Sequence, residues 1–183
     1  MKKKITAIVG SLRENSCNRQ LAMMAIERIG ARADVEILEY GDVPLFNQDA
    51  ERPAPASVKR VRDAVRASDG VWFFTPEYNH SYPGVLKNLV DWLSRPANLG
   101  EKHVLAGKPA AFSGVGMGIS GTTVAQDLFV ALISFLDMRV MNAPRVTIPN
   151  AHALLDEGGN LSLGVGAAFL DAQVEAFLQF IGA

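Results

Sequence analysis

The chain has 183 residues, of which 49% are hydrophobic and 20% charged, and this composition predicts one globular domain over residues 1–183 with a sizeable core. Eighteen basic and nineteen acidic side chains give a net charge of −1, so neither nucleic acid nor an anionic membrane surface is expected as a partner. The single cysteine, Cys17, excludes an internal disulfide, and with only three histidines no metal centre is expected. The first apolar run is too short for a signal peptide or a membrane span, so we expect a cytoplasmic protein without membrane insertion.

The hydrophobic pattern predicts strands that alternate with helices along the whole chain. Strands are expected at residues 5–9, 35–39, 71–75 and 109–113, and a fifth between 138 and 148 is expected to be broken by Pro144. Helices are expected at residues 19–32, 57–65, 85–93, 122–135 and 167–181. Such alternation is typical of an α/β three-layer sandwich with a parallel sheet. A chain of this size with a polar loop after its first strand fits the flavodoxin-like five-stranded order 2-1-3-4-5.

The first loop, residues 10–19, joins the first strand to the first helix and is rich in groups that bind phosphate. Ser11 and Ser16 offer hydroxyls, Asn18 an amide and Arg13 a fixed positive charge, beside a helix N-terminus that favours anions. The loop lacks the glycine and lysine of a nucleotide-triphosphatase loop and the three glycines of a dinucleotide fingerprint. These features favour a single terminal phosphate, such as that of FMN. The alternative is that Ser16 only caps the helix and Arg13 is a solvated charge.

The second loop, residues 75–84, follows the central strand and flanks the same crevice as the first loop in the expected strand order. Tyr78 can lie against a flat ring, and Asn79 can both donate to and accept from ring atoms. We therefore expect a flat heterocycle at this loop, although an ordinary proline-bounded turn is the alternative. His80 is a candidate proton donor, but a lone loop histidine is more often simply solvated.

The third loop, residues 113–121, contains the glycine pattern Gly116-x-Gly118-x-x-Gly121. The match is weak, because only one strand remains to be formed behind it, although Asp137 lies near the spacing expected for a ribose-binding acid. We interpret this segment as a flexible loop that passes close to the edge of the ligand. Direct contact with a nicotinamide cofactor is the less favoured alternative.

Together the three loops resemble the NADPH-dependent FMN reductase family and, within it, the bacterial quinone and chromate reductases. The resemblance covers nearly the whole chain and is carried by residues 10–13 with Ser16 and Asn18, by residues 75–79 with Ser81, and by residues 83–92. It implies a flavodoxin-like fold, non-covalent FMN, NADPH or NADH as co-substrate, and a homodimer or homotetramer whose interface walls the flavin sites.

The resemblance also implies which residues bind the cofactor. By position these are Ser11, Arg13, Ser16 and Asn18 at the phosphate, with Cys17 beside them; Glu77, Tyr78, Asn79 and His80 at the isoalloxazine, with Pro76 beside them; and Ser113, Gly114 and Gly116 at its far edge. Two positions depart from the family pattern. Cys17 replaces a bulky residue and is interpreted as packing, with a redox role as the minor alternative. Val124 stands where many relatives carry arginine. The resemblance therefore does not indicate how NAD(P)H is held or whether its 2′-phosphate is recognised.

The predicted function is that of an FMN-dependent NAD(P)H:acceptor oxidoreductase, which passes hydride from NAD(P)H through N5 of FMN to a small-molecule acceptor. Quinones, chromate, azo dyes and free flavin all remain open as acceptors. No catalytic side chain is required, because the flavin carries the chemistry. The main alternative is a flavodoxin-like electron carrier without reductase activity, and a second is an FMN-free α/β protein that binds another phosphate ester. Arg13 and the low net charge are unusual for the carrier.

Overall fold

The computed structural model describes all residues from 1 to 183. Its centre is one parallel sheet whose strands are β1 (Lys3–Val9), β2 (Ala33–Ile37), β3 (Gly70–Phe74), β4 (Pro109–Val115), β5 (Arg139–Val140) and β6 (Val146–Ile148). The strand order is β2-β1-β3-β4-β5, and β6 also pairs with β4. The predicted 2-1-3-4-5 order is therefore confirmed.

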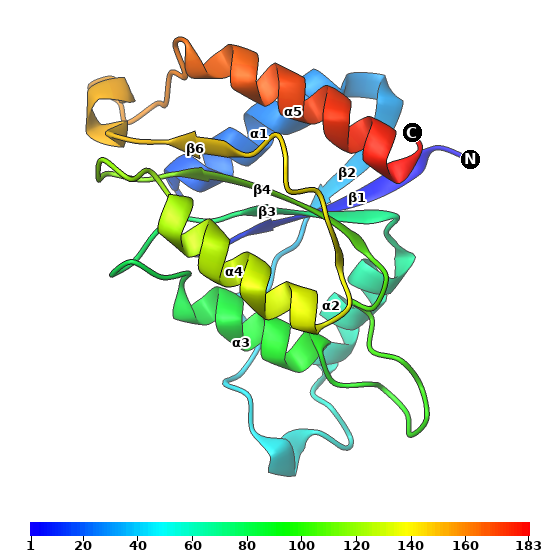
Figure 1. Cartoon of the computed structure of the whole chain (residues 1–183). Coiled ribbons are helices and arrows are strands. Elements are labelled where there is room, and N and C mark those ends of the chain that lie inside the picture. The colour runs from blue at the N-terminus through cyan, green and yellow to red at the C-terminus, as the bar shows by residue number, and fades with distance from the viewer.

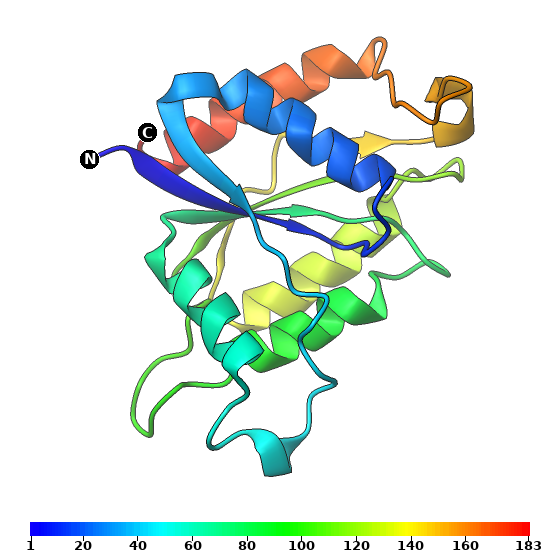
Figure 2. The same cartoon turned by 180° about the vertical axis from the view of Figure 1, so that it is seen from behind.

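Helices cover both faces of this sheet and give the predicted three layers (Figure 1). Helices α1 (Cys17–Ile29) and α5 (Gly166–Ile181) lie on one face, while α2 (Ala56–Ala67), α3 (Gly84–Leu93) and α4 (Thr123–Phe135) lie on the other, as the reverse view also shows (Figure 2). Three short 3-10 segments, η1 (Gly30–Arg32), η2 (Gln48–Ala50) and η3 (Ala151–Leu154), occur in the connections. None of the helices is both long enough and apolar enough to cross a bilayer.

Strand β3 explains how one sheet carries two cores. Its residues are all buried, and successive side chains of a strand point to opposite faces. Trp72 packs with Phe74 and with Phe177 of α5 at ring-centroid distances of 5.3 and 5.1 Å. Phe73 lies on the other face, 4.9 Å from the ring of Phe129 in α4. The run of apolar residues therefore indicated a central strand correctly.

The last sheet position is split between β5 and β6, as the proline in this segment predicted. Both short strands pair with β4, and Pro144, which cannot donate a backbone hydrogen bond, lies between them. Gln173 of α5 reaches into this break. Its side-chain amide donates to the carbonyl oxygens of Phe112 and Pro144 at 2.6 and 2.9 Å and accepts from the Ser113 hydroxyl at 2.5 Å. A buried side chain thus replaces the missing strand contacts.

Candidate functional site

The loops after β1, β3 and β4 enclose a cleft of about 580 Å³ at the carboxyl ends of these strands. These loops lie at the left-hand edge of the sheet in Figure 1. The three strands are neighbours in the sheet, so the loops that follow them meet at one edge. All the predicted cofactor-binding residues except Ser113 and Gly114 line the cleft: Ser11, Arg13, Ser16, Cys17, Asn18, Pro76, Glu77, Tyr78, Asn79, His80 and Gly116. Segments far apart in the sequence are therefore brought together as expected.

The first loop has free donors for an anion. Ser16 caps α1 by accepting from the backbone N–H of Arg19 at 3.4 Å, so the capping alternative is correct for its oxygen. The backbone N–H groups of Cys17 and Asn18, in the first turn of the helix, meet no acceptor within the protein. Arg13 is exposed and takes part in none of the salt bridges of the structure. Two unpaired N–H groups, a free guanidinium and the helix dipole form a site that fits a phosphate.

The Asn18 side chain performs a structural task. Its amide nitrogen donates to the carbonyl oxygen of Val115, and its amide oxygen accepts from the Val115 backbone N–H, both at 2.9 Å. Asn18 is buried, and this pair of bonds ties the start of α1 to the end of β4. Both polar atoms are thus used within the protein. Cys17, the first residue of α1, is also buried and forms part of the cleft wall.

A buried tyrosine that the sequence reasoning missed supports the base of the first loop. The Tyr40 hydroxyl donates to the carbonyl oxygen of Val9, the last residue of β1, at 2.6 Å. Burial raises the pKa of Tyr40 well above its ordinary value, and the nearby Tyr78 adds to the effect. The phenol therefore stays protonated and keeps its hydrogen bond at any physiological pH. Its signal in the sequence was weak, because Tyr40 lies beyond the end of the second strand.

The second loop forms a tight hairpin that presents Asn79 and His80. Tyr78 and Ser81 exchange two backbone hydrogen bonds of 2.9 and 3.0 Å. Between them Asn79 and His80 both have positive φ, of 52° and 56°, which is the pattern of a type I′ turn. The alternative of a turn is correct for the backbone. The turn lines the cleft, however, so its side chains remain available to a ligand.

Glu77 connects the second loop to the third. One carboxylate oxygen accepts from the Ser120 hydroxyl at 2.9 Å, and the other accepts from the backbone N–H of Ala125 at 3.0 Å, in the first turn of α4. The side chain is only 8% exposed. Since the N-cap residue of α4 makes no side-chain cap, Glu77 supplies the missing acceptor from outside the helix. The His80 Nδ1 atom lies 3.4 Å from the same carboxylate.

Two glycines of the third loop are required by its own backbone. A Cβ atom on Gly116 would lie 1.9 Å from the carbonyl oxygen of Gly121, and Gly121 itself has a φ of +62°. The loop therefore folds back on itself at two positions where a side chain would clash or strain the chain. This packing accounts for Gly116 and Gly121 of the glycine pattern, whereas a Cβ atom on Gly118 would meet nothing within 4 Å.

Ser113 and Gly114 are the two predicted cofactor-binding residues that do not line the cleft. Strand β4 continues to Val115, two residues beyond its predicted end, so both positions lie within the sheet. Ser113 is fully buried, and its hydroxyl accepts from Trp72 Nε1 at 2.9 Å. Other residues form that wall of the cleft instead, and they were not named individually from the sequence: Val115, Met117, Gly118, Ile119, Ser120 and Gly121. The sequence signal for them was only their position after the fourth strand.

Comparison with known proteins gives one consistent result. Residues 3–153 match the model of the NADPH-dependent FMN reductase family. A quinone reductase from Pseudomonas putida is 38% identical over 178 residues, which cover 97% of this chain and 94% of the relative. A 2-hydroxy-1,4-benzoquinone reductase from Burkholderia is 36% identical over 158 residues, with 86% and 85% covered. The structure of FerB, a flavoenzyme NAD(P)H:(acceptor) oxidoreductase from Paracoccus denitrificans, superimposes with a TM-score of 0.87 at 35% identity and covers 98% of this chain and 97% of its own.

These matches agree with the fold and with the cleft. The predicted enzyme class, an NAD(P)H-dependent flavin oxidoreductase, is confirmed, because the family and the three relatives named above are reductases. The electron-carrier alternative is not favoured. The chain belongs to the NADPH-dependent FMN reductase family.

Proposed function

We propose that this chain binds FMN non-covalently in the cleft and reduces a quinone-class acceptor with NADPH or NADH. The observation that carries the proposal is the cleft, which joins an anion-binding helix N-terminus to a loop with aromatic and amide side chains. The names of the quinone reductase relatives support the acceptor class. In this proposal the whole chain serves as one cytoplasmic FMN-binding domain.

The phosphate end of the cleft has the more specific geometry. Arg13 offers a charged donor, Ser11 and Ser16 offer hydroxyls, and the backbone N–H groups of Cys17 and Asn18 point out of the first turn of α1. Asn18 therefore contributes its N–H group, because its side chain is bound to Val115. In this proposal buried Cys17 contributes packing and a backbone donor.

The ring end of the cleft lies between the second and third loops. Tyr78 is 51% exposed and can cover a flat ring, while Asn79 can donate to and accept from ring atoms. Pro76 of the second loop and Gly116 of the third loop line the cleft beside them. Bound FMN supplies the hydride chemistry at this end, and the protein orients the acceptor over the ring and excludes water.

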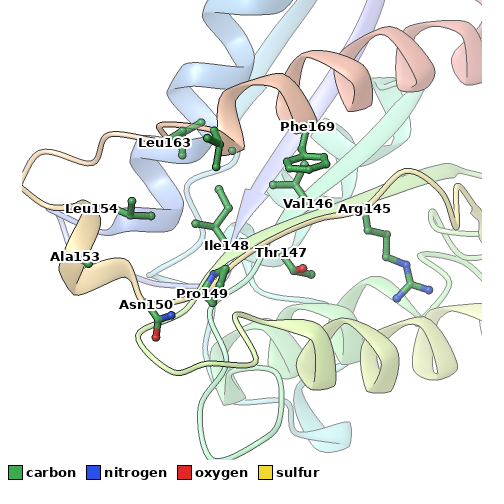
Figure 3. A pocket seen from close by; sticks show the side chains of 12 residues that line it. Arg145, Val146, Thr147, Ile148, Pro149, Asn150, Ala153, Leu154, Leu163 and Phe169 are labelled. Carbon is green, nitrogen blue, oxygen red and sulfur yellow. The ribbon is translucent and has the colours of Figure 1, made fainter.

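We further propose a homodimer formed through α4 and the free edge of β6. Helix α4 presents the outward-facing apolar residues Val124, Leu128, Ala131 and Phe135 at helical spacing, and Phe135 is 87% exposed. Next to them a hollow of about 470 Å³ opens between β6 and the start of α5, with Phe169 at its rim (Figure 3). Arg145 borders the hollow and pairs with Asp127 of α4 at 2.6 Å, so helix and hollow form one continuous face. An apolar face of this kind is typical of an interface between protein copies.

Sedimentation velocity tests the dimer. Phe135→Ser is expected to shift the protein towards monomer, whereas Leu45→Ser, at a position that is also highly exposed (83%) but lies elsewhere, leaves the mass unchanged. A monomeric wild-type protein, or equal masses for the two variants, would contradict this interface.

An anaerobic absorbance spectrum tests the main proposal. Purified protein is mixed with FMN, passed through a gel-filtration column and recorded before and after one equivalent of NADPH. We expect a retained flavin band that NADPH bleaches and that a benzoquinone then restores. A retained band that does not bleach would favour a carrier, and a colourless protein would refute FMN binding.

A further inference from the structure

We propose that His80 donates the proton that quinone reduction requires and that Glu77 holds it in place; this inference rests on the proposed function. Reduction of a quinone to a hydroquinone adds two electrons and two protons. Transfer of a hydride brings both electrons and one proton, so an acid has to supply the second proton to a carbonyl oxygen. The structure assigns that task to one side chain at the mouth of the cleft.

The geometry of the turn aims His80 at the cleft. Asn79 and His80 occupy the two left-handed positions of a hairpin closed by two backbone hydrogen bonds, so the histidine backbone is rigid. The imidazole is 81% exposed and lines the cleft. Its Nδ1 atom lies 3.4 Å from a Glu77 carboxylate oxygen. With Nδ1 facing the carboxylate, Nε2 is the atom left to meet an acceptor.

Glu77 is itself immobilised, which makes it a suitable anchor. Its carboxylate accepts hydrogen bonds from Ser120 in the third loop and from Ala125 in the first turn of α4. A carboxylate fixed in this way faces the imidazole and can accept a hydrogen bond from His80 Nδ1. In a protonated imidazole both ring nitrogens are donors, so Nδ1 can bond to Glu77 while Nε2 faces the acceptor.

No other side chain of the cleft suits the task. Besides His80, the titratable groups that line the cleft are Arg13 of the first loop, Cys17 of α1, and Glu77 and Tyr78 of the second loop, whereas residues 115–121 contribute none. In the proposed function Arg13 binds the phosphate and Tyr78 covers the ring, while the thiol of Cys17 is buried and Glu77 accepts hydrogen bonds from Ser120 and Ala125. Imidazole is the side-chain group that gains and loses a proton between pH 5 and 8.

The transfer is balanced. The N–H bond at His80 Nε2 breaks, an O–H bond forms at the quinone oxygen, and the hydride supplies the electron pair that reduces the ring. His80 is left as neutral imidazole beside Glu77. Since the side chain is 81% exposed, it regains a proton from water before the next turnover.

The first test compares two acceptors in His80→Asn, a substitution chosen because asparagine tolerates positive φ. Benzoquinone takes up protons on reduction, whereas ferricyanide accepts one electron and no proton. We expect the ratio of benzoquinone to ferricyanide turnover to fall by about 100-fold, the lower end of the range of general acid catalysis. His152→Asn, at an exposed histidine outside the cleft, is the matched control and should keep the wild-type ratio.

The outcomes separate this inference from the function on which it rests. An unchanged ratio in His80→Asn overturns the role of His80 while the proposed function stands. A wild-type protein that oxidises NADPH with neither acceptor refutes the proposed function, and the inference falls with it.

The second test needs no cofactor and no turnover. The imidazole proton signals of the cofactor-free protein are compared by NMR between the wild type and Glu77→Gln at one pH. Loss of the neighbouring carboxylate is expected to change the chemical shifts of the His80 ring protons, while the His152 signals in the same spectra stay in place as an internal control. Unchanged His80 signals would overturn the positioning role of Glu77.

Discussion

Replacement of Arg13 by alanine tests the phosphate end of the cleft most directly. Arg13 is exposed and forms no ion pair, so its removal leaves no stranded charge and should not destabilise the fold. A hydrogen bond to a charged group contributes about 1.5–3 kcal/mol, and 1.4 kcal/mol corresponds to a tenfold change in affinity. Because the loop is open to solvent, we expect the lower part of this range. Arg13→Ala should therefore raise the dissociation constant for FMN by about 10- to 30-fold.

The assay is a fluorescence titration of cofactor-free protein with FMN and, in parallel, with riboflavin, which has the same ring but no phosphate. The loss of affinity should appear with FMN and be absent with riboflavin. Arg52→Ala is the matched control, because Arg52 is also exposed and lies outside the cleft. Unchanged FMN affinity, or an equal loss for both ligands, would refute the assignment of the loop to the phosphate.

Three further predictions concern the loop, the core and pH. Gly116→Ala should abolish measurable FMN binding in the same titration, because the new Cβ would lie 1.9 Å from a backbone oxygen. Gln173→Leu should lower the free energy of unfolding, measured in urea, by about 2–4 kcal/mol, since it removes the donor to the Phe112 and Pro144 carbonyl groups and the acceptor of the buried Ser113 hydroxyl. The hydrogen bond from Arg95 holds the pKa of Glu51 in the folded protein below its ordinary value. Ionised Glu51 therefore stabilises the fold at pH values above its ordinary pKa, and this stabilisation is lost as pH falls through the lowered pKa of the folded state. Glu51→Gln should therefore be less stable than the wild type at pH 7, with the difference shrinking below about pH 4 in the same urea assay.

Each of these predictions has a control in the chain. Gly84→Ala should be tolerated, because no atom lies within 4 Å of the position that its Cβ would take. Gln179→Leu changes an exposed glutamine of the same helix and should have little effect on unfolding. Normal FMN binding by Gly116→Ala would contradict the clash predicted for its Cβ atom. Equal stability losses in Gln173→Leu and Gln179→Leu would contradict the role of the buried glutamine. A stability difference for Glu51→Gln that grows in acid would contradict the role of the Arg95 hydrogen bond.

The fold could be predicted well because its signals are local. The buried strand β3 was visible as an unbroken apolar run, and the split of the last sheet position followed from Pro144. The ends of elements were less accurate. Strand β4 continues through Ser113 and Gly114, because these small residues fit between β3 and β6. No local pattern in the sequence predicts this continuation of the strand. Because β4 is longer than predicted, Ser113 and Gly114 lie in the sheet and do not line the cleft.

The roles of single side chains depended on contacts that the sequence does not show. Asn18 lies 97 positions from Val115, and Glu77 lies 48 positions from Ala125. Both were predicted as cofactor-binding residues, and both line the cleft, but their polar side-chain atoms form hydrogen bonds with other residues of the protein. Only the folded sheet brings these partners together, so composition and spacing could identify the loops without assigning each side chain.

The hydrogen bonds of the Asn18 and Glu77 side chains hold the walls of the cleft in place before a ligand binds. Asn18 fixes the first wall of the cleft to the end of β4, and Glu77 fixes the second wall to the third loop and to α4. The cavity is therefore held open by the protein alone, and little chain has to be ordered when a molecule enters. A protein that has lost its cofactor therefore keeps the shape of the cleft and can bind the cofactor again without refolding any of its loops.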